Sequence, residues 1–372
     1  MKSKVFSVTS VEELESNLQG VQAKGMVPTL AIVFASVAHD LEDFKIAFAK
    51  YDIEVFGASS SGEIVDDEVL EEAVAVMLLD ISREAFRLNV FDGQGKTSFG
   101  VGQAIAEWAK SIYENPAMML MSAGLLVDGQ QLVKGVIDHM GLELPLFGGL
   151  AADDLNFKET FVFNASRVVS NGAVALIFDQ SVVALQGHAV SGWKGIGTPK
   201  TVTKATGNIV HEIDDEPALD MYNKYLKIGD DPALAVEYPL LLIREDDSVV
   251  LRAVMRVNED KSIVYAGTVP EGAKVRFSMP PGSEITDLAI EQMSEFNRQI
   301  PSSDAIVLFS CKARHLALGP MVEDEISAIH RLWNVPLVGF FTYGEIGPAA
   351  EVGCDFHNYT LIPVLINEKV NP

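Results

Sequence analysis

The tripeptide Gly-Glu-Ile occurs twice, at Gly62–Ile64 and at Gly344–Ile346, and each copy follows a short apolar run. A related acidic bend, Asp153-Asp154, follows the apolar segment that begins at Leu144. Glycine lets a backbone come close to a neighbouring chain or a ligand, and a carboxylate can hold an amine. The three bends are therefore the first candidates for a polar ligand site.

Further polar side chains flank these bends. Hydroxyl groups precede each glutamate, and a thiol and a guanidinium follow the strand expected at Ala305–Phe309. An arginine can hold a ligand carboxylate through two parallel hydrogen bonds, and convergent polar groups near glycines suit a small polar ligand. The candidate ligand-binding residues are Ser59, Ser60, Ser61, Glu63, Asp153, Asp154, Ser310, Cys311, Arg314, Thr342, Tyr343 and Glu345.

Other chemistries for the same residues stay open. The glutamates could cap backbone amides, with Arg314 paired to one of them. Cys311 with His315, and Cys354 with His357, could bind zinc if the two segments meet. Cys311 activated by His315, or a serine of Ser59–Ser61, could serve a hydrolase as nucleophile. No G-x-S-x-G elbow surrounds those serines, which disfavours the last alternative.

The elements that would position these residues repeat three times along the chain. Each copy has an amphipathic helix, an apolar strand, a second amphipathic helix and a second apolar strand that ends in an acidic bend. The first helix begins at Ser10, which forms a capping-box pattern with Glu13. The first apolar strand of the three repeats is expected at Thr29–Ala35, Ala117–Met121 and Ala305–Phe309, and the second strand of the third repeat at Leu337–Phe341. The strands that follow the bends are expected at Ala73–Leu79, Gly172–Phe178 and Tyr359–Ile366.

Parallel strands joined by a helix form a right-handed crossover, and ligands gather at their carboxyl ends. The loops of each repeat are therefore expected at one edge of its sheet. The segment Thr201–Pro281 has a different pattern, which predicts a helix at Ala218–Leu226 followed by an antiparallel meander. The predicted fold class is α/β, with mixed-sheet domains built from repeated α-β-α-β-turn-β units and an antiparallel insertion. The predicted domains are residues 1–204 and 205–372.

Composition excludes several classes of partner. The 372 residues are 48% hydrophobic and carry a formal net charge of −24, which would repel nucleic acid and anionic membranes. No apolar run has the roughly 18 residues that a membrane helix requires. The N-terminus lacks the features of a signal peptide, and two cysteines give no disulfide framework. These features favour a cytoplasmic protein.

Several segments together resemble the FIST family, with an N-terminal and a C-terminal FIST domain. They are FGASSSGEI, PLFGGLAADD with FNASRVVSNGAVALIF, LFSCKARHLALG, and GFFTYGEIGP with FHNYTLIPVLI. The resemblance implies a non-enzymatic sensor in bacterial signal transduction that binds small molecules such as amino acids. It also implies a partner such as a histidine kinase or a cyclic-di-GMP enzyme.

A subset of stand-alone two-domain members, which this chain resembles in layout, binds haem and senses nitric oxide. A haem iron requires an axial ligand on an apolar wall. His188, at the end of the apolar strand expected at Val182–Val190, fits that description best among the seven histidines. No Cys-x-x-Cys-His motif is present, so a haem would be held without a covalent link.

Overall fold

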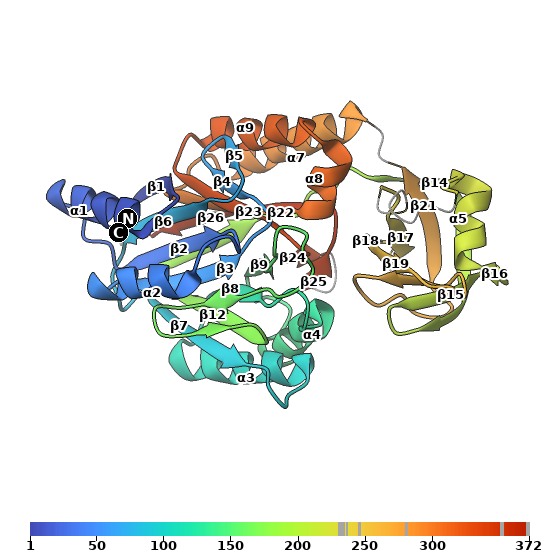
Figure 1. The fold of residues 1–372 in the computed structure, drawn as a ribbon, viewed down its shortest axis with the longest axis horizontal. Helices are drawn as coiled ribbons and strands as arrows, with labels where there is room; N and C mark the ends of the chain where they lie inside the picture. The colour runs from blue at the N-terminus through green and yellow to red at the C-terminus, as the bar shows by residue number, and fades with distance from the viewer. Residues whose placement is uncertain (230–234, 236, 245–246, 280–281, 350–352, 370–372) are drawn as a thin grey trace.

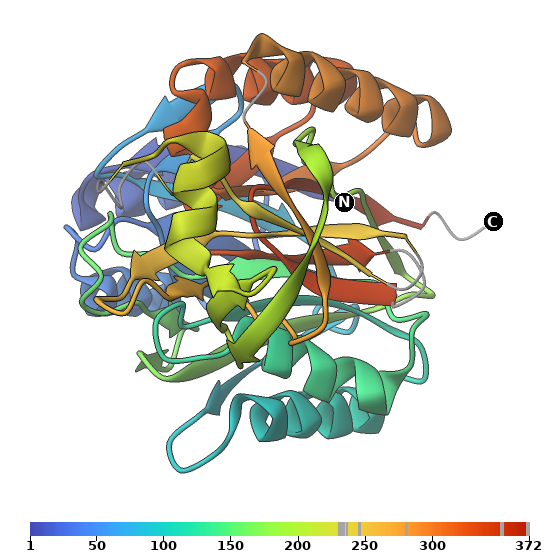
Figure 2. The same ribbon diagram turned by 90° about the vertical axis from the view of Figure 1, so that its right-hand side faces the viewer.

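The computed structural model describes residues 1–229, 235, 237–244, 247–279, 282–349 and 353–369. Three six-stranded mixed sheets form a body in which helices cover the outer faces (Figure 1). A separate antiparallel sheet with one helix stands at the side of the body opposite the chain termini. Figure 2 looks onto this insertion, with α5 in front of its strands.

The first repeat shows the plan of all three. Its strands have the order β1-β6-β2-β3, in which β2 and β3 are parallel and β6 runs antiparallel between β1 and β2. Ser10 and Asp40 cap the two helices through their side-chain oxygens. The elements are β1 (Lys2–Val8), α1 (Val11–Ala23), β2 (Leu30–Ala35), α2 (Leu41–Lys50), β3 (Glu54–Ser59) and β6 (Val74–Asp80).

The other two repeats have the same strand order, β7-β12-β8-β9 and β13-β26-β22-β23, which confirms the predicted α/β class and its repeated unit. The third repeat adds helix α8, where a loop was predicted. The second repeat contains β7 (Phe86–Asp92), α3 (Ser98–Ile112), β8 (Pro116–Ser122), α4 (Gly129–Met140), β9 (Leu146–Leu150) and β12 (Gly172–Asp179). The third contains β13 (Val183–Gly187), α7 (Ser283–Gln299), β22 (Ala305–Cys311), α8 (Lys312–Leu318), α9 (Met321–Trp333), β23 (Leu337–Thr342) and β26 (Leu361–Glu368).

After its acidic bend each repeat sends a hairpin into the sheet of another repeat. Hairpin β4–β5 (Glu63–Val65, Glu68–Leu70) of the first repeat pairs with β23 of the third. Hairpin β10–β11 (Val162–Phe163, Val168–Val169) of the second pairs with β3 of the first. Hairpin β24–β25 (Glu345–Ala349, Gly353–His357) of the third pairs with β9 of the second. The exchange is cyclic, so every repeat completes one neighbour and is completed by the other.

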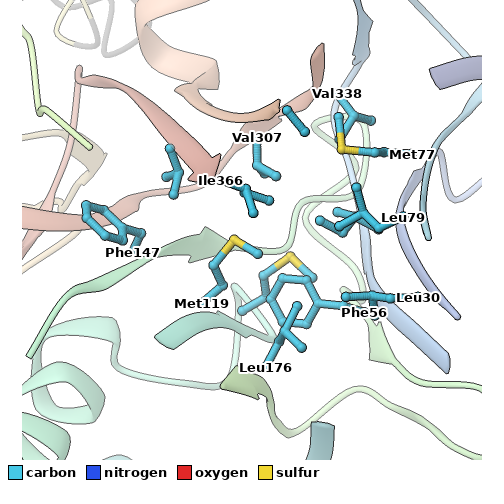
Figure 3. Packing of buried hydrophobic residues seen from close by; sticks show 14 of the residues in the cluster. Leu30, Phe56, Met77, Leu79, Met119, Phe147, Leu176, Val307, Val338 and Ile366 are labelled. Carbon is cyan, nitrogen blue, oxygen red and sulfur yellow. The ribbon is translucent and has the colours of Figure 1, made fainter. Parts of the chain in front are cut away.

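One hydrophobic core lies between the inner faces of the three sheets (Figure 3). Leu30, Phe56 and Leu79 reach it from the first repeat, Met119 and Leu176 from the second, and Val307, Val338 and Ile366 from the third. Each outer face packs separately against its own pair of helices. Burial of both faces explains why the strands are nearly continuous apolar runs.

The insertion has its own small core. Helix α5 (Ala218–Leu226) covers one face of a sheet that includes β14 (Lys194–Thr206), β15 (Ile209–Ile213), β17 (Leu240–Ile243), β18 (Val249–Arg252), β19 (Val254–Val257), β20 (Ile263–Tyr265) and β21 (Lys274–Met279). β16 (Glu216–Pro217) pairs with β15. The predicted helix and meander are found here, and the predicted domain boundary at residue 204 falls inside β14. Within the described ranges, no helix is both long and apolar enough to cross a membrane.

Three glycines occupy equivalent positions of the parallel strand pairs. Gly148 and Gly339 lie close to the backbone of the partner strand, whereas Gly57 leaves space for the Phe163 ring. Gly57, Gly148 and Gly339 pair with Val33, Leu120 and Leu308 respectively. A Cβ at Gly148 would overlap the Leu120 carbonyl oxygen, which belongs to the backbone and cannot move aside.

We therefore expect Gly148→Ala to lower the free energy of unfolding by about 3 kcal/mol, measured by urea denaturation. Gly20→Ala is the matched control, because Gly20 is exposed on α1 with no neighbouring atom near a new Cβ. That change should be neutral or stabilise by about 0.5–1 kcal/mol. Equal stability of the two variants would contradict the close packing of β8 and β9.

Candidate functional site

The three acidic bends meet at one place and bond to one another through their backbones. The first and third bends are linked by Ser61 N to Phe341 O at 3.2 Å and Phe341 N to Gly62 O at 3.0 Å. Leu150 N donates to Gly344 O at 2.8 Å, which joins the second and third. We call the segments Ser59–Glu63, Leu150–Asp154 and Thr342–Glu345 the junction.

The remaining side of the junction joins the first and second bends. Ala152 N donates to Ser59 O at 2.9 Å, and Asp154 N donates to Ser60 O at 3.2 Å. The Ser59 hydroxyl donates to Ala152 O at 2.6 Å. The three bends therefore form a closed ring of hydrogen bonds, and the sequence-predicted residues of all three repeats are brought together.

The two glutamates of the junction occupy equivalent, fully buried positions. Glu63 accepts hydrogen bonds from the Ser60 hydroxyl and from Ala73 N at 3.0 Å. Glu345 accepts from the Thr342 hydroxyl and, at its other oxygen, from the Thr360 hydroxyl at 2.6 Å. The Thr360 amide donates to the same oxygen of Glu345, and the Cys311 thiol also donates to this carboxylate. Each glutamate therefore ties its bend to the strand that returns to the same sheet.

Burial changes the acidity of both side chains. Desolvation raises the pKa of Glu63 and that of Glu345 to about 7, although the hydroxyl hydrogen bonds lower both values. The nearby Asp154 raises the pKa of Glu63 further, and Lys312 opposes it. Both carboxyl groups therefore change protonation close to neutral pH.

The two aspartates of the second bend have different roles. Asp153 is buried and accepts backbone hydrogen bonds from Phe157, Lys158 and Glu159, so it shapes its own loop. It also accepts a 2.6 Å hydrogen bond from the Tyr343 hydroxyl, and this contact raises the Tyr343 pKa after the larger effect of burial. Asp154 accepts from the Ser36 hydroxyl at 2.7 Å.

Arg314 is buried, and its partners are within the protein. Its guanidinium forms a two-bond pair with Glu325, with Nε to Oε2 at 2.9 Å. The Nη1 group donates to the carbonyl oxygens of Ser191 and Tyr359. The expected alternative, pairing with a junction glutamate, is thus replaced by pairing with Glu325 of α9. In this structure the guanidinium forms hydrogen bonds with Glu325, Ser191 and Tyr359.

The remaining candidate pair, Cys311 and His315, does not form an activated nucleophile. Burial raises the pKa of the Cys311 thiol, so it stays protonated at neutral pH. His315 stacks on Phe341 with ring centroids 4.1 Å apart. Among the described residues, no group of three or more His, Cys, Asp or Glu could hold a metal ion. The hydroxyls of Ser61, Ser122 and Ser310 are buried at the carboxyl ends of the strands and have no hydrogen-bond partner among the residues that the structure describes.

His188 does not fit the role of a haem ligand in this structure. The residue is exposed and its ring stacks on Phe296 with centroids 5.7 Å apart, whereas an axial haem ligand requires an enclosing apolar wall. The buried His357 is held differently, with Nε2 3.3 Å from Gly347 O, and burial lowers its pKa to about 4. That imidazole is neutral at physiological pH.

A cleft opens next to the junction, between the insertion and the body. Its cavity has a volume of about 520 Å³, which is within the range for small-molecule sites. Thr360, which bonds to Glu345, lies in its wall together with His357 and Trp193. A molecule in the cleft would therefore contact a residue that is bonded directly to a junction carboxylate.

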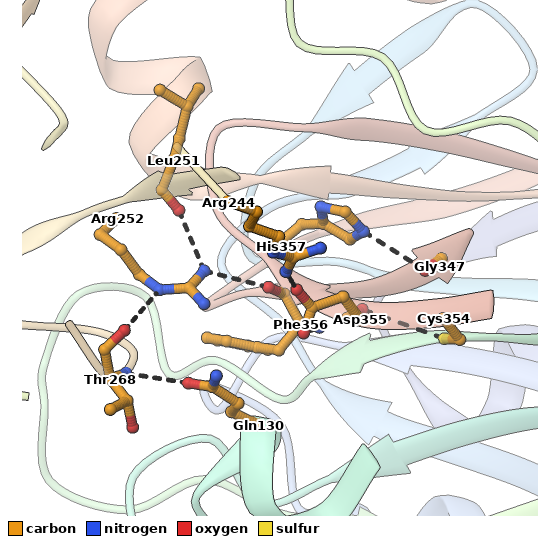
Figure 4. Close-up of polar contacts among 10 residues, drawn as sticks. All are labelled: Gln130, Arg244, Leu251, Arg252, Thr268, Gly347, Cys354, Asp355, Phe356 and His357. Atoms are coloured by element: carbon orange, nitrogen blue, oxygen red, sulfur yellow. Dashed lines mark hydrogen bonds and ion pairs between the residues drawn. The ribbon is translucent and has the colours of Figure 1, made fainter. Parts of the chain in front are cut away.

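Arginines hold the insertion against the body beside this cleft (Figure 4). Arg252 is fully buried and donates to the carbonyl oxygens of Thr268, Leu251 and Phe356. Arg244 pairs with Asp355 of β25. Burial, with a smaller contribution from Arg244, lowers the pKa of Arg252 to about 9.

Sequence reasoning missed most of the cleft. The segment that holds His357 and Thr360 is distant in the sequence from Arg244 and Trp193, and no spacing rule connects them. The one usable indication was the glycine-rich loop around Trp193, a large aromatic residue in a polar, flexible sequence. Trp193 is buried, and it packs in the interface between the insertion and the body.

Three mixed α/β repeats closed around a shared core, with an insertion over their acidic bends, define the architecture. The chain belongs to the FIST family: the FIST N domain matches residues 29–216 and the FIST C domain matches residues 218–348. FIST domains are sensory domains that bind small ligands.

Several similar proteins carry the name of uncharacterized proteins. An uncharacterized protein of Mycobacterium tuberculosis is 26% identical over 244 residues, which cover 58% of this chain and 60% of that protein. An uncharacterized protein of Mycobacterium bovis is 25% identical over 233 residues, covering 58% and 59%. One from Methanocaldococcus jannaschii is 34% identical over 114 residues, covering 27% and 20%. This chain thus spans about 60% of the length of the mycobacterial relatives.

The buried pair Arg314–Glu325 gives a stability prediction. Arg314→Met should lower the free energy of unfolding by about 3–5 kcal/mol, because Glu325 would be left charged and buried. Adding Glu325→Leu should recover most of that loss. Lys134→Met, at an exposed pair with Asp138, is the control and should cost less than about 0.5 kcal/mol. Urea denaturation of the three variants and the unmodified protein tests this, and equal costs for Arg314→Met and Lys134→Met would refute it.

The raised pKa values of Glu63 and Glu345 give a pH prediction. Between the ordinary value of 4.5 and about 7 the folded chain binds more protons than the unfolded chain. These two groups therefore make the free energy of unfolding fall as the pH rises through that window. In the double variant Glu63→Gln/Glu345→Gln, the free energy of unfolding should fall less as the pH rises. Urea denaturation at a series of pH values measures this.

Glu107→Gln is the control for this series, because Glu107 is exposed on α3. It should keep the pH dependence of the unmodified protein. If the double variant also keeps it, the two glutamates do not titrate in the window that their burial implies.

Proposed function

We propose that this chain is a non-enzymatic sensor that binds a small molecule in the cleft between the insertion and the body. The observation that carries the proposal is the position of Thr360, whose side chain lines the cleft and donates to the buried Glu345. Occupancy of the cleft can thereby change the hydrogen bonding of the junction, where all three repeats meet.

The junction suits a conformational readout because its bonds connect all three sheets. A ligand shifts a conformational equilibrium only by its differential affinity for the two states. A molecule that contacts both the insertion and Thr360 would stabilise the arrangement in which those parts are close. The junction residues Glu63, Asp153 and Glu345 would then transmit the occupied state and not contact the ligand themselves.

The output of the sensor follows from the family resemblance. We infer a cytoplasmic protein that regulates a histidine kinase or a cyclic-di-GMP enzyme. The two cysteines, Cys311 and Cys354, are free thiols in the structure, which suits a reducing compartment. An acidic chain would pair with a basic patch on such a partner.

Binding can be followed through Trp193, whose indole lies in the wall of the cleft. Free amino acids and small organic acids would be titrated while tryptophan fluorescence is recorded. A ligand of the cleft should change the fluorescence, and Thr360→Val should weaken its binding by about tenfold, because the contact to the junction is lost.

Two variants serve as controls for that titration. Trp193→Phe should remove the fluorescence response, since Trp108 and Trp333 pack in other cores. Thr206→Val, at an exposed position of the insertion, should bind like the unmodified protein. A ligand that binds Thr360→Val at full strength and still changes the fluorescence of Trp193→Phe would place the site elsewhere.

A further inference from the structure

The cleft is larger than one cavity, because a second hollow lies on the other side of Trp193. This hollow has a volume of about 710 Å³ and shares Trp193, Lys194 and Val249 with the first. Its floor is the face of the insertion sheet that looks toward the body, opposite the face covered by α5. We call the two hollows together the Trp193 cleft.

Cations dominate the charged lining of this cleft. Lys194, Arg244, Lys274 and Arg276 line it, and Asp247 is the one carboxylate among its described lining residues. The chain as a whole has 52 acidic and 28 basic residues. Lys194 pairs with Glu284 and Arg244 pairs with Asp355, so Lys274 and Arg276 are the lining cations that favour an anion.

The strand register places the cations beside an apolar surface. Arg276 pairs with Leu241, and Lys274 pairs with Ile243, so these four side chains share one face of the sheet. Gly195 on the adjacent strand leaves space for the Arg276 side chain, which a Cβ at that position would meet. The Arg276 stem therefore lies across β14 next to the leucine and isoleucine.

Two residues that line the cleft each have a buried hydrogen-bond donor. Among the residues that the structure describes, neither Trp193 Nε1 nor Arg276 Nε has a hydrogen-bond partner. Within the described part of the chain, Arg276 has no ion-pair partner either. A buried donor without an acceptor costs about 1–3 kcal/mol, so such groups call for an explanation.

Trp193 itself is held rigidly. Its ring packs edge-on against Tyr359 with centroids 5.0 Å apart, and the Arg314 guanidinium lies 5.2 Å from its centroid. The ion pair of Arg314 with Glu325 fixes that guanidinium in turn. A rigid indole with a free N–H provides a flat contact surface and a directed donor at little entropic cost.

We propose that the Trp193 cleft binds a small organic anion, with a carboxylate or phosphate group and an apolar body. The acidic group pairs with the Arg276 guanidinium and the Lys274 ammonium, which both line the cleft. The apolar body lies against Leu241, Ile243 and the indole ring. This inference rests on the proposed function and names the ligand class of the same site.

The test compares four probes by isothermal titration calorimetry with the whole chain. Phenyl phosphate and benzoate combine an aromatic body with the two anionic groups, benzamide has the body without charge, and inorganic phosphate has the charge without the body. We expect at least one aromatic anion to bind about tenfold or more tighter than benzamide and than inorganic phosphate. Comparison of phenyl phosphate with benzoate identifies the preferred acidic group.

Variants locate the binding. Arg276→Gln should weaken the preferred anion by about tenfold, and added salt should weaken it in the unmodified protein. Lys204→Gln is the control, since Lys204 is exposed on β14 and pairs with Glu212. It should bind like the unmodified protein, and Arg276→Gln should keep its unfolding temperature if the loss is local.

Each remaining outcome overturns the inference in a distinguishable way. If benzamide binds as tightly as the aromatic anions, the cleft recognises the apolar body and not the acidic group. The proposed anionic ligand class is then wrong, although a small molecule still binds in the cleft. Equal affinity of Arg276→Gln for the anion places the acidic group elsewhere. If none of the four probes binds, but an amino acid changes Trp193 fluorescence, the proposed sensor survives without this ligand class. If no small molecule changes that fluorescence, both proposals fail.

Discussion

A closed ring of backbone hydrogen bonds among three acidic bends is the constraint on which the rest of this protein depends. Each bend accepts from one neighbour and donates to another, at 2.8–3.2 Å. Each repeat also sends its hairpin into the next sheet, so the ring and the hairpin exchange enforce the same cyclic order. No repeat can leave the body without breaking backbone pairs on both sides.

The ring explains the chemistry of the buried acids. A carboxylate buried in a protein is costly unless hydrogen bonds satisfy it, and Glu63 and Glu345 are both satisfied by a hydroxyl and a backbone amide. Burial still raises both pKa values to about 7, so the junction can gain or lose protons near neutrality. The junction is thus polar, buried and closely connected, and the open space for a ligand lies next to it.

Local patterns in the sequence were sufficient to predict the elements. Helical spacing in Leu14 and Leu18, the caps at Ser10 and Asp40, and apolar runs such as Leu30–Ala35 all act within one turn or one strand. Repetition of an acidic bend after each apolar strand predicted that the three units fold alike, and the carboxyl-end rule predicted that their loops converge. The helix of the insertion, Ala218–Leu226, was also predicted with its observed bounds.

Those local patterns could not predict which segments contact one another when they are distant in the sequence. The hairpins are only two to five residues per strand, too short to show which sheet they join. Arg314 could have paired with any of several acids, and its choice of Glu325 depends on the packing of α8 against α9. The cleft draws Thr360, Arg244 and Trp193 from distant segments, and its cations lie among many more acids in the sequence.

Native-state hydrogen exchange of the ring amides tests the central claim most directly. The amides of Ser61, Leu150, Ala152, Tyr343 and Phe341 close the ring between different repeats. The ring predicts that all five exchange in one slow class, with the same opening free energy, because none can open alone. Fast exchange of the amides in one bend, while the other two bends stay protected, would show that the repeats are independent and would contradict the account.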